Sequence, residues 1–178
     1  MIIVTGNPGK AREIREILGE DIEQIDYDYT EIQSPSLKEI SEYGARECYE
    51  RFEEPCLVDD SGLFVDGLEG FPGPYSSYVY GTIGNQGILR TMRGIENRDA
   101  SFRCVASYCD SRGVRSFKGR VDGVIAREER GQHGFGYDPI FEHVETHRTF
   151  GEMKREEKNE ISHRRRAFEK FAEWYREP

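Results

Sequence analysis

Four short stretches of the sequence combine residue types that could do chemistry on an anion. The first is Thr5-Gly6-Asn7-Pro8-Gly9-Lys10, between an apolar run and an amphipathic segment. Glycines let backbone N–H groups turn toward an anion, a helix N-terminus adds partial positive charge, and Lys10 adds a full charge. The GxxxxGK[ST] pattern of a P-loop is absent. Taken alone, the stretch fits a tight turn with a surface lysine equally well.

The second stretch, Val58-Asp59-Asp60-Ser61-Gly62-Leu63, has two adjacent carboxylates after an apolar run. Neighbouring side chains of a strand point to opposite faces, so we expect only one of Asp59 and Asp60 in a given site. A carboxylate at the carboxyl end of a strand in an α/β protein suits Mg²⁺ binding or water activation. The alternative is an Asp-rich turn in which Asp60 or Ser61 bonds to the local backbone.

The third stretch, Gly134-Phe135-Gly136-Tyr137-Asp138-Pro139-Ile140-Phe141, has an aromatic residue between two glycines. An aromatic ring on such a loop can stack on a purine base. The alternative is a structural loop whose aromatic residues fill the core, and we expect this for Phe141.

The fourth stretch runs from Lys158 to Arg166. Ser162 is a natural N-cap, which would place His163 and Arg164 in the first turn of the last helix. Cations oppose the helix dipole there, so an anion or a carboxylate is expected nearby. For Arg165 and Arg166 we favour a solvated basic surface paired with neighbouring glutamates.

Hydrophobic periodicity predicts the elements that position these stretches. Apolar runs predict short strands at 2–5, 22–27 and 56–58, and helical spacing predicts helices after residue 8, at 36–51, at 82–93 and from 162. Alternation predicts a strand at 101–109, a hairpin partner at 114–118 and a further strand at 121–126. We therefore expect an α/β fold whose mixed sheet is bent into two lobes with a cleft between them.

The composition limits the kinds of protein the chain can be. Its 178 residues include 25 Lys+Arg and 34 Asp+Glu, a formal net charge of −9. A long nucleic acid requires a basic face, so no such polymer is expected as a partner. No apolar run could span a bilayer, and we expect no export leader. Four cysteines without a CxxC pair indicate reduced thiols, and hence a cytoplasmic protein.

In order and spacing, the four stretches resemble the motifs of the HAM1-like inosine triphosphate pyrophosphatases. The family's Thr/Ser-x-Asn-x-x-Lys motif corresponds to Thr5–Lys10, and its Asp-Asp-Ser-Gly-Leu motif to Asp59–Leu63. Its Phe-Gly-Tyr-Asp-Pro-x-Phe and Glu-Lys-Asn-x-x-Ser-His-Arg motifs correspond to Phe135–Phe141 and Glu157–Arg164. The resemblance covers essentially the whole chain.

The resemblance implies a single ITPase-like domain over 1–178, with an elongated two-lobed α/β fold and a central cleft. It also implies a homodimer that hydrolyses ITP, dITP and XTP, with Mg²⁺, to the monophosphate and pyrophosphate. Such an enzyme removes deaminated purines from the nucleotide pool. Hypoxanthine and xanthine carry a carbonyl group at C6 where adenine carries an amino group. Donors such as His163 and Arg164 would therefore favour the first two bases.

The resemblance further implies roles for individual residues. Asp60 would be the general base and, with Glu31, a metal ligand, and Asp59 is a further candidate ligand. Substrate binding would involve Thr5, Gly6, Asn7, Pro8, Gly9, Lys10, Ser61, Phe135, Gly136, Tyr137, Asp138, Lys158, His163 and Arg164. Thr5, Asn7 and Lys10 would hold the triphosphate, and Phe135 and Asp138, with the backbone between them, would hold the base.

One position departs from the family pattern. Many relatives carry a lysine–alanine pair in the second helix, where this chain has Gly44-Ala45. Arg46 follows two residues later, about 200° around the helix, so we do not expect it to replace the lysine. Two alternatives remain open: a Maf-like pyrophosphatase for modified or pyrimidine nucleotides, and a nucleotide-binding protein without catalysis.

Overall fold

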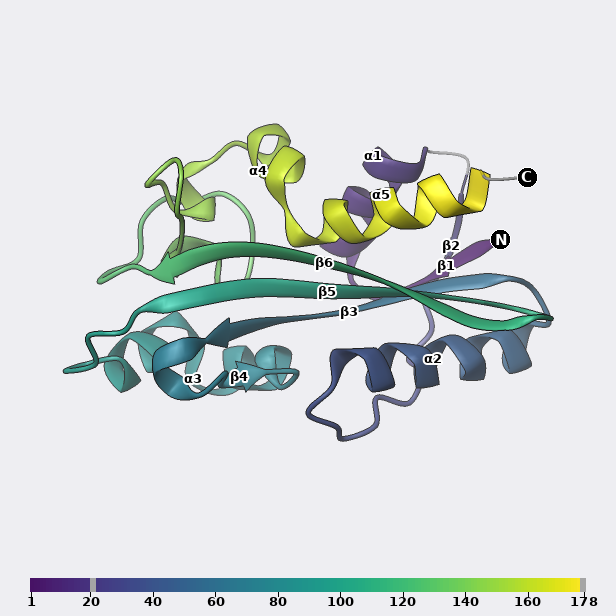
Figure 1. Ribbon diagram of the computed structural model, residues 1–178, viewed down its shortest axis with the longest axis horizontal. Coiled ribbons are helices and arrows are strands. Elements are labelled where there is room, and N and C mark those ends of the chain that lie inside the picture. The colour runs from purple at the N-terminus through teal and green to yellow at the C-terminus, as the bar shows by residue number, and fades with distance from the viewer. Residues whose placement is uncertain (20–21, 177–178) are drawn as a thin grey trace. The chain divides into compact units, whose positions relative to one another are not determined.

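The computed structural model describes residues 1–19 and 22–176, which form one seven-stranded sheet with helices on both faces (Figure 1). The strands are β1 (Ile2–Val4), β2 (Glu23–Ile25), β3 (Cys56–Val65), β4 (Pro72–Gly73), β5 (Asp99–Asp110), β6 (Gly113–Ile125) and β7 (Phe141–His143). The helices are α1 (Pro8–Leu18), α2 (Leu37–Phe52), α3 (Ser76–Thr91), α4 (Arg155–Ile161) and α5 (His163–Arg176). No helix among these residues is both long and apolar enough to cross a membrane.

The sheet is mixed, as predicted. Its strand order is β2-β1-β3-β5-β6-β7, with β4 paired to β3. β1 runs parallel to both β2 and β3, whereas β6 and β7 are antiparallel. The parallel pairs come from the strand–helix alternation at the start of the chain, and the α/β class is therefore confirmed.

The chain divides into two compact units. Unit 1 takes in the described residues of Met1–Ser61, Cys104–Gly119 and His163–Pro178, and unit 2 takes in Gly62–Arg103 and Arg120–Ser162. β3, β5 and β6 contribute residues to both units. Each unit has its own buried apolar core.

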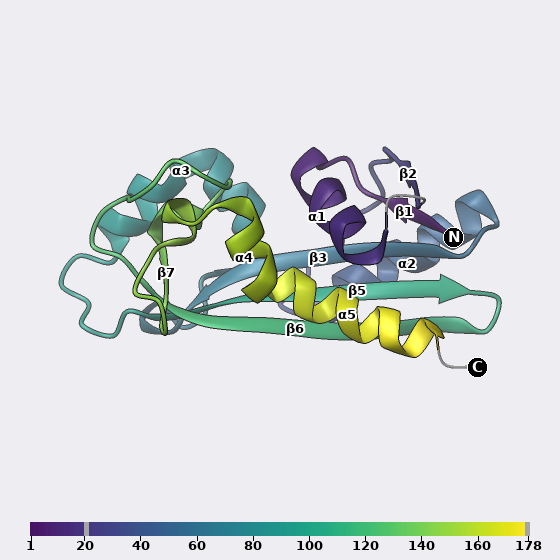
Figure 2. The same cartoon turned by 90° about the horizontal axis from the view of Figure 1, so that it is seen from above.

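In unit 1 the strands separate two apolar layers because successive side chains point to opposite faces. Ile3 and Leu57 pack with Phe168 of α5 and Ile14 of α1. On the other face, the residues one position away in β1 and β3 pack against α2; they are Ile2, Val4, Cys56 and Val58. Figures 1 and 2 show α1 and α5 together on one side of these strands and α2 on the other.

All four cysteines, Cys48, Cys56, Cys104 and Cys109, are buried free thiols of unit 1. Burial raises the pKa of Cys48 and of Cys56 to about 12, and it raises the pKa of the other two as well. The thiols therefore stay protonated and contribute to the core as small apolar groups.

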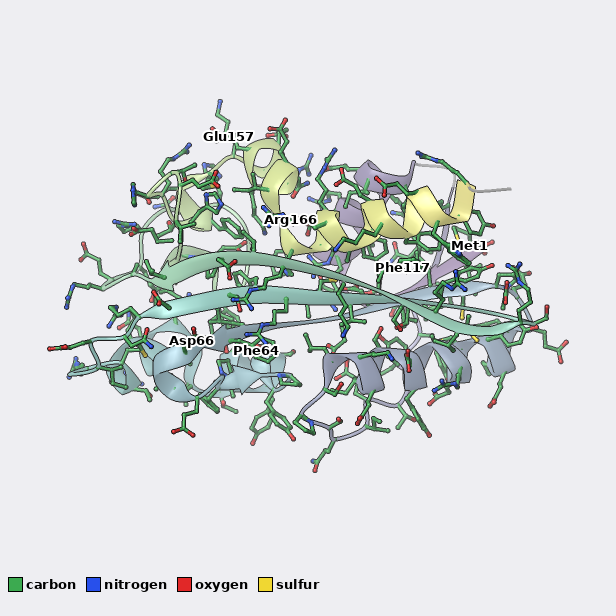
Figure 3. All side chains as sticks on the ribbon, in the orientation of Figure 1. Met1, Phe64, Asp66, Phe117, Glu157 and Arg166 are labelled. Atoms are coloured by element: carbon green, nitrogen blue, oxygen red, sulfur yellow. The ribbon has the colours of Figure 1, made fainter. Side chains whose placement is uncertain are left out.

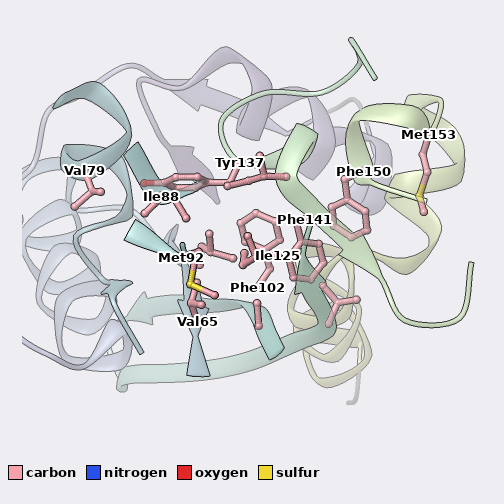
Figure 4. Packing of buried hydrophobic residues seen from close by; sticks show 14 residues of the cluster. Val65, Val79, Ile88, Met92, Phe102, Ile125, Tyr137, Phe141, Phe150 and Met153 are labelled. Atoms are coloured by element: carbon pink, nitrogen blue, oxygen red, sulfur yellow. The ribbon is translucent and has the colours of Figure 1, made fainter. Parts of the chain in front are cut away.

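The core of unit 2 combines aliphatic side chains with a group of aromatic rings (Figure 4). Phe141 is fully buried, as predicted, with its ring centroid 4.6 Å from that of Phe102 and 5.0 Å from that of Phe150. Tyr137 belongs to the same cluster.

Two strand predictions were too short. β3 continues to Val65 instead of ending at Val58, so the Asp-Asp-Ser-Gly stretch lies within a strand and is not a turn. Gly62 is required there by close approach, since a Cβ atom on it would overlap the Gly73 carbonyl oxygen of β4. The segments 114–118 and 121–126 form the single strand β6, which ends at Ile125.

α3 begins at Ser76, six residues before the predicted start at 82. Ser76 Oγ donates to the Gly73 carbonyl (2.6 Å) and accepts from the Leu63 N–H (2.8 Å), which fixes the chain at the start of the helix. Gly84 has a non-helical backbone inside α3 (φ 59°), and this interrupts the periodicity on which the prediction depended.

Candidate functional site

The first motif forms the connection between β1 and α1. Asn7 is the N-cap of α1, and its Oδ1 accepts from the N–H groups of Gly9 (2.9 Å) and Lys10 (3.1 Å). Thr5 Oγ1 accepts from the Asn7 N–H at 3.2 Å. No acidic side chain lies in the first turn of α1 itself, and the nearest carboxylate to Gly6 comes from Asp26, after β2. Thr5 and Asn7 therefore shape a turn that can receive an anion.

Lys10 connects this turn to the second motif. Its Nζ donates to the backbone carbonyl of Asp59 at 3.1 Å and lies 3.4 Å from Asp59 Oδ2. The ammonium group is partly exposed, with 21% of the side chain accessible, whereas the Asp59 side chain is 1% exposed. Lys10 can therefore contact both this carboxylate and an incoming anion.

Asp59 belongs to a buried network on the α1 and α5 face of β3. Arg164 donates through Nε to Asp59 Oδ2 (3.2 Å), through Nη1 to Glu13 Oε2 (2.5 Å) and through Nη2 to Ser61 Oγ (3.2 Å). Ser61 Oγ in turn donates to Asp59 Oδ2 at 3.0 Å. Arg164, Glu13 and Asp59 are 2%, 4% and 3% exposed. All three guanidinium nitrogens are thus engaged within unit 1.

The charges of this network stabilise one another. Burial alone would raise the pKa of Asp59, but Lys10 and Arg164 hold it well below its usual range. Burial would also lower the pKa of Arg164, whereas Glu13 and Asp59 raise it above its usual value. Asp59 is therefore permanently ionised and paired, which makes it a poor proton acceptor.

Asp60 points to the opposite face of β3. Its Oδ1 accepts from the Ser61 N–H at 2.9 Å, but its Oδ2 is buried without a hydrogen-bond partner among the described residues. Burial raises the pKa of Asp60 to about 7; Lys10 opposes this increase, and Asp59 and Glu31 add to it. Asp60 is therefore the carboxylate of this pair with a pKa suited to proton transfer near neutrality.

The residues around Asp60 fit a magnesium ion. No group of three or more His, Cys, Asp or Glu residues within 1–19 and 22–176 is arranged to hold a metal. Mg²⁺ does not require such a group, because it keeps several waters and uses one or two carboxylates together with substrate phosphates. The unpartnered Oδ2 of Asp60 and the exposed Glu31, whose charge acts on it, provide two such carboxylates.

The third and fourth motifs meet in unit 2. Lys158 Nζ donates to Asp138 Oδ2 at 2.7 Å, and the Phe135 N–H donates to the same oxygen at 2.9 Å. The ammonium group also lies 4.6 Å from the centroid of the Phe135 ring. Lys158 and Asp138 are buried, whereas Phe135 is 44% exposed. The structure thus brings together an exposed aromatic ring and a buried ion pair.

Other members of these motifs have structural roles. The Tyr137 side chain lies in the core and its hydroxyl donates to the Ser76 carbonyl at 2.9 Å, which does not support substrate contact by its ring. The Gly136 carbonyl accepts from Asn85 Nδ2 at 3.1 Å. His163 is buried at the first residue of α5, in unit 1.

The exposed positions of the fourth motif lie where the sequence predicts. Arg165 Nε is 2.6 Å from Glu169 Oε1, and Arg166 is exposed on α5. Figure 3 shows Glu157 extending outward from α4, where it pairs with Arg148 at 3.1 Å. Arg46 of α2 is exposed, and its Nη2 lies 3.8 Å from Glu42 Oε2.

Two residues near the site were missed by sequence reasoning. Glu13 is a charged residue among the buried positions of α1, next to Ile14, and this mismatch with its neighbours was the available signal. Tyr29 lies near Asp59, Asp60 and Glu31, and nothing in its sequence context indicated this.

The fold and the site together define an α/β protein with a carboxylate-rich site beside the N-terminus of its first helix. The chain belongs to the Ham1 family, whose sequence model matches residues 1–174. A dITP/XTP pyrophosphatase of Methanopyrus kandleri is 52% identical over 180 residues, which cover 99% of this chain and 96% of that protein. One of Thermococcus kodakarensis is also 52% identical, covering 99% and 97%.

Solved structures agree with this assignment. A HAM1 protein from Coxiella burnetii has a TM-score of 0.87 and 32% identity, covering 98% of each chain. The Staphylococcus aureus Ham1 protein has a TM-score of 0.86 and 30% identity, covering 98% of this chain and 97% of its own. The resemblance inferred from the four motifs is therefore confirmed.

Proposed function

We propose that this chain is a Mg²⁺-dependent nucleoside triphosphate pyrophosphatase that hydrolyses ITP, dITP and XTP to the monophosphate and pyrophosphate. The observation that carries the proposal is the buried Asp60 Oδ2, which has no partner among the described residues and adjoins Asp59, whose carbonyl accepts from Lys10 Nζ. The names of the relatives from Methanopyrus and Thermococcus support the substrate class. The cellular role would be removal of deaminated purines from the nucleotide pool.

Unit 1 provides the groups for phosphate chemistry. Lys10 and the positive end of the α1 dipole attract the triphosphate and neutralise charge as it develops. Arg164 fixes Asp59, which in turn holds Lys10 in place. Mg²⁺, when bound by Asp60 and Glu31, supplies charge neutralisation and acidifies the attacking water.

Asp60 acts as the general base. The Ser61 N–H fixes the carboxyl group through Oδ1, and this carboxyl group takes a proton from the attacking water. A pKa near the working pH maximises the product of the ionised fraction and the driving force for proton transfer. In unit 1, Asp59 is then the ionised, paired neighbour that raises the proton affinity of Asp60.

Unit 2 provides the groups for base recognition. The exposed Phe135 ring can stack on a purine. Lys158, held by Asp138, is a donor that favours a 6-oxo group over an amino group. For Arg164 we now favour positioning of Asp59 over contact with the base, because Glu13, Asp59 and Ser61 already accept from its three nitrogens.

The decisive experiment measures pyrophosphate release from ITP, dITP, XTP, ATP, GTP and pyrimidine triphosphates with Mg²⁺. We expect the first three to be preferred over ATP. Preference for pyrimidine nucleotides would favour the Maf-like alternative. Release of orthophosphate alone would show that the bond between the α and β phosphates is not the one cleaved. Binding of ITP without hydrolysis would favour a nucleotide-binding protein.

We also propose a homodimer formed through the first half of α3. Five large side chains between residues 71 and 83 are at least 41% exposed: Phe71, Tyr75, Tyr78, Tyr80 and Ile83. Residues 70–89 contain no charged side chain, although 33% of the chain is charged. A twofold interface places a surface against its own copy, so an uncharged surface avoids like-charge repulsion.

The buried, reduced thiols favour the cytoplasm as the compartment in which the protein acts.

A further inference from the structure

The ring of Tyr29 covers α2 at Gly44. A Cβ atom on Gly44 would lie 2.5 Å from Cε2, 2.6 Å from Cδ2 and 3.3 Å from Cζ of Tyr29, closer than side chains pack. Glycine is unfavourable in a helix interior compared with alanine, so Gly44 in the middle of α2 calls for a packing reason. Accommodation of the Tyr29 ring is that reason. The Tyr29 ring therefore occupies the space that a side chain at position 44 would need.

Tyr29 packs against the apolar cluster on the α2 face of β3, which includes Val58 and Ala45. Asp60 lies two residues after Val58 in the same strand, so its side chain points to this face as well. The phenol is a neutral O–H donor near pH 7. In the part of the chain that the structure describes, Tyr29 makes no hydrogen bond through this hydroxyl. Asp60 Oδ2 nearby is likewise a buried acceptor without a partner in that part of the chain.

We propose that Tyr29 is a substrate-binding residue whose hydroxyl donates a hydrogen bond to the phosphate chain of the nucleotide, and that Gly44 exists to admit its ring. The inference rests on the proposed function for the identity of the substrate. A phosphate oxygen bound beside Asp60 is an anionic acceptor for an unpaired donor there. A neutral donor adds binding without competing with a cation for the carboxylates, as a second lysine would.

The central test replaces Tyr29 by phenylalanine, which keeps the ring over Gly44 and removes only the hydroxyl. We expect kcat/KM for ITP to fall about tenfold to a hundredfold, as for loss of a hydrogen bond to a charged group, with the melting temperature unchanged. Affinity for inorganic tripolyphosphate with Mg²⁺, measured by calorimetry, should fall by a similar factor. Tripolyphosphate carries no base, so it isolates contacts to the phosphate chain.

The matched control is Tyr27→Phe. Tyr27 lies two residues earlier, and its hydroxyl donates to Glu47 Oε1 at 3.2 Å, outside the acidic cluster. We expect this variant to keep wild-type kcat/KM and tripolyphosphate affinity. Wild-type values of both quantities in Tyr29→Phe would overturn the proposal and leave Tyr29 as a packing residue.

Gly44→Ala tests the second half of the proposal. The added Cβ must displace the Tyr29 ring, so this variant should lose activity as Tyr29→Phe does. Gly44→Ala in the Tyr29→Phe background should lower kcat/KM little further. Its effect depends on displacing the Tyr29 hydroxyl, which Tyr29→Phe has already removed. If the losses of kcat/KM from Gly44→Ala and Tyr29→Phe are fully additive in free energy, the two residues do not act together. Should Gly44→Ala fail to fold, Tyr29→Phe decides the question alone.

The result also separates this inference from the proposed function. A wild-type protein that hydrolyses no purine triphosphate, but whose tripolyphosphate affinity depends on the Tyr29 hydroxyl, would refute the function and support the inference. A wild-type pyrophosphatase that does not respond to Tyr29→Phe would do the reverse.

Discussion

Asp59 and Asp60 are adjacent in the sequence but lie in different electrostatic environments. The strand directs Asp59 toward Lys10 and Arg164, which keep it ionised, and directs Asp60 to the other face, where no hydrogen bond from the described residues reaches its Oδ2. The separation onto two faces could be predicted from strand alternation alone. The pairing of Asp59 with Arg164 could not, because it joins residues 105 positions apart.

Replacing Asp60 by asparagine tests its role as base. We expect hydrolysis of ITP to fall by about 10²–10⁴-fold, since the amide cannot accept the proton. The fold should persist, because Asn retains the size of Asp60 and can still accept from the Ser61 N–H. Pyrophosphate release and the melting temperature are the measurements, and near-normal turnover by the folded variant would refute the assignment.

Replacing Arg164 by methionine tests the buried network. Glu13 and Asp59 would lose their buried cation, at a cost of about 3–5 kcal/mol in unfolding free energy. Asp59 has a depressed pKa, so it stabilises the wild type above pH 4 and loses this contribution as pH falls. Loss of Arg164 raises that pKa. The difference in unfolding free energy between variant and wild type should therefore shrink as the pH falls below about 4.

Urea denaturation at several pH values measures this effect. Arg165→Met is the control, because its ion pair with Glu169 is partly exposed and should contribute no more than about 1 kcal/mol. If the loss of unfolding free energy in Arg164→Met does not vary with pH, it does not arise from the titration of Asp59.

At the scale of elements, α1 begins where its N-cap also shapes the candidate anion site. Asn7→Ala should lower the unfolding free energy by about 1 kcal/mol. It should also raise KM for ITP, because the Lys10 backbone loses the bond that orients the first turn. Ser36→Ala removes the equivalent cap of α2, where Ser36 Oγ accepts from the Glu39 N–H at 3.3 Å. It should cost similar stability and leave KM unchanged.

Equal effects of the two cap variants on KM would show that the Asn7 side chain has no special part in binding. Urea denaturation and steady-state kinetics on the same preparations provide both quantities.

Elements with strong local signals were predicted well and those shaped by contacts were not. The α2 capping serine and the amphipathic α5 were visible in the sequence. The length of β3 was not, because the Asp-rich stretch also fitted a turn. Gly62 within it is required by the close approach of the Gly73 carbonyl of β4. In the site, the four motifs were identifiable, whereas Tyr29 depends on its contact with Gly44, fifteen residues away.

At the scale of the whole molecule, the uncharged surface of α3 predicts the oligomeric state. Tyr78 is 74% exposed, so Tyr78→Glu should leave each protomer folded while placing two like charges at the interface. We expect light scattering to report a dimer for the wild type and a monomer for this variant. Tyr43→Glu, at an exposed tyrosine of α2 in unit 1, is the control. A dimer unaffected by Tyr78→Glu would exclude this surface.

The buried cysteines allow local opening of the protein to be followed by chemical modification. All four lie in unit 1, and their protonated thiols cannot react with an alkylating reagent until that unit opens. The rate of alkylation, read by mass spectrometry, therefore measures the opening of unit 1 without any engineered label. Because Lys10 and Asp60 belong to the same unit, nucleotide binding there should lengthen the time before the first thiol is modified.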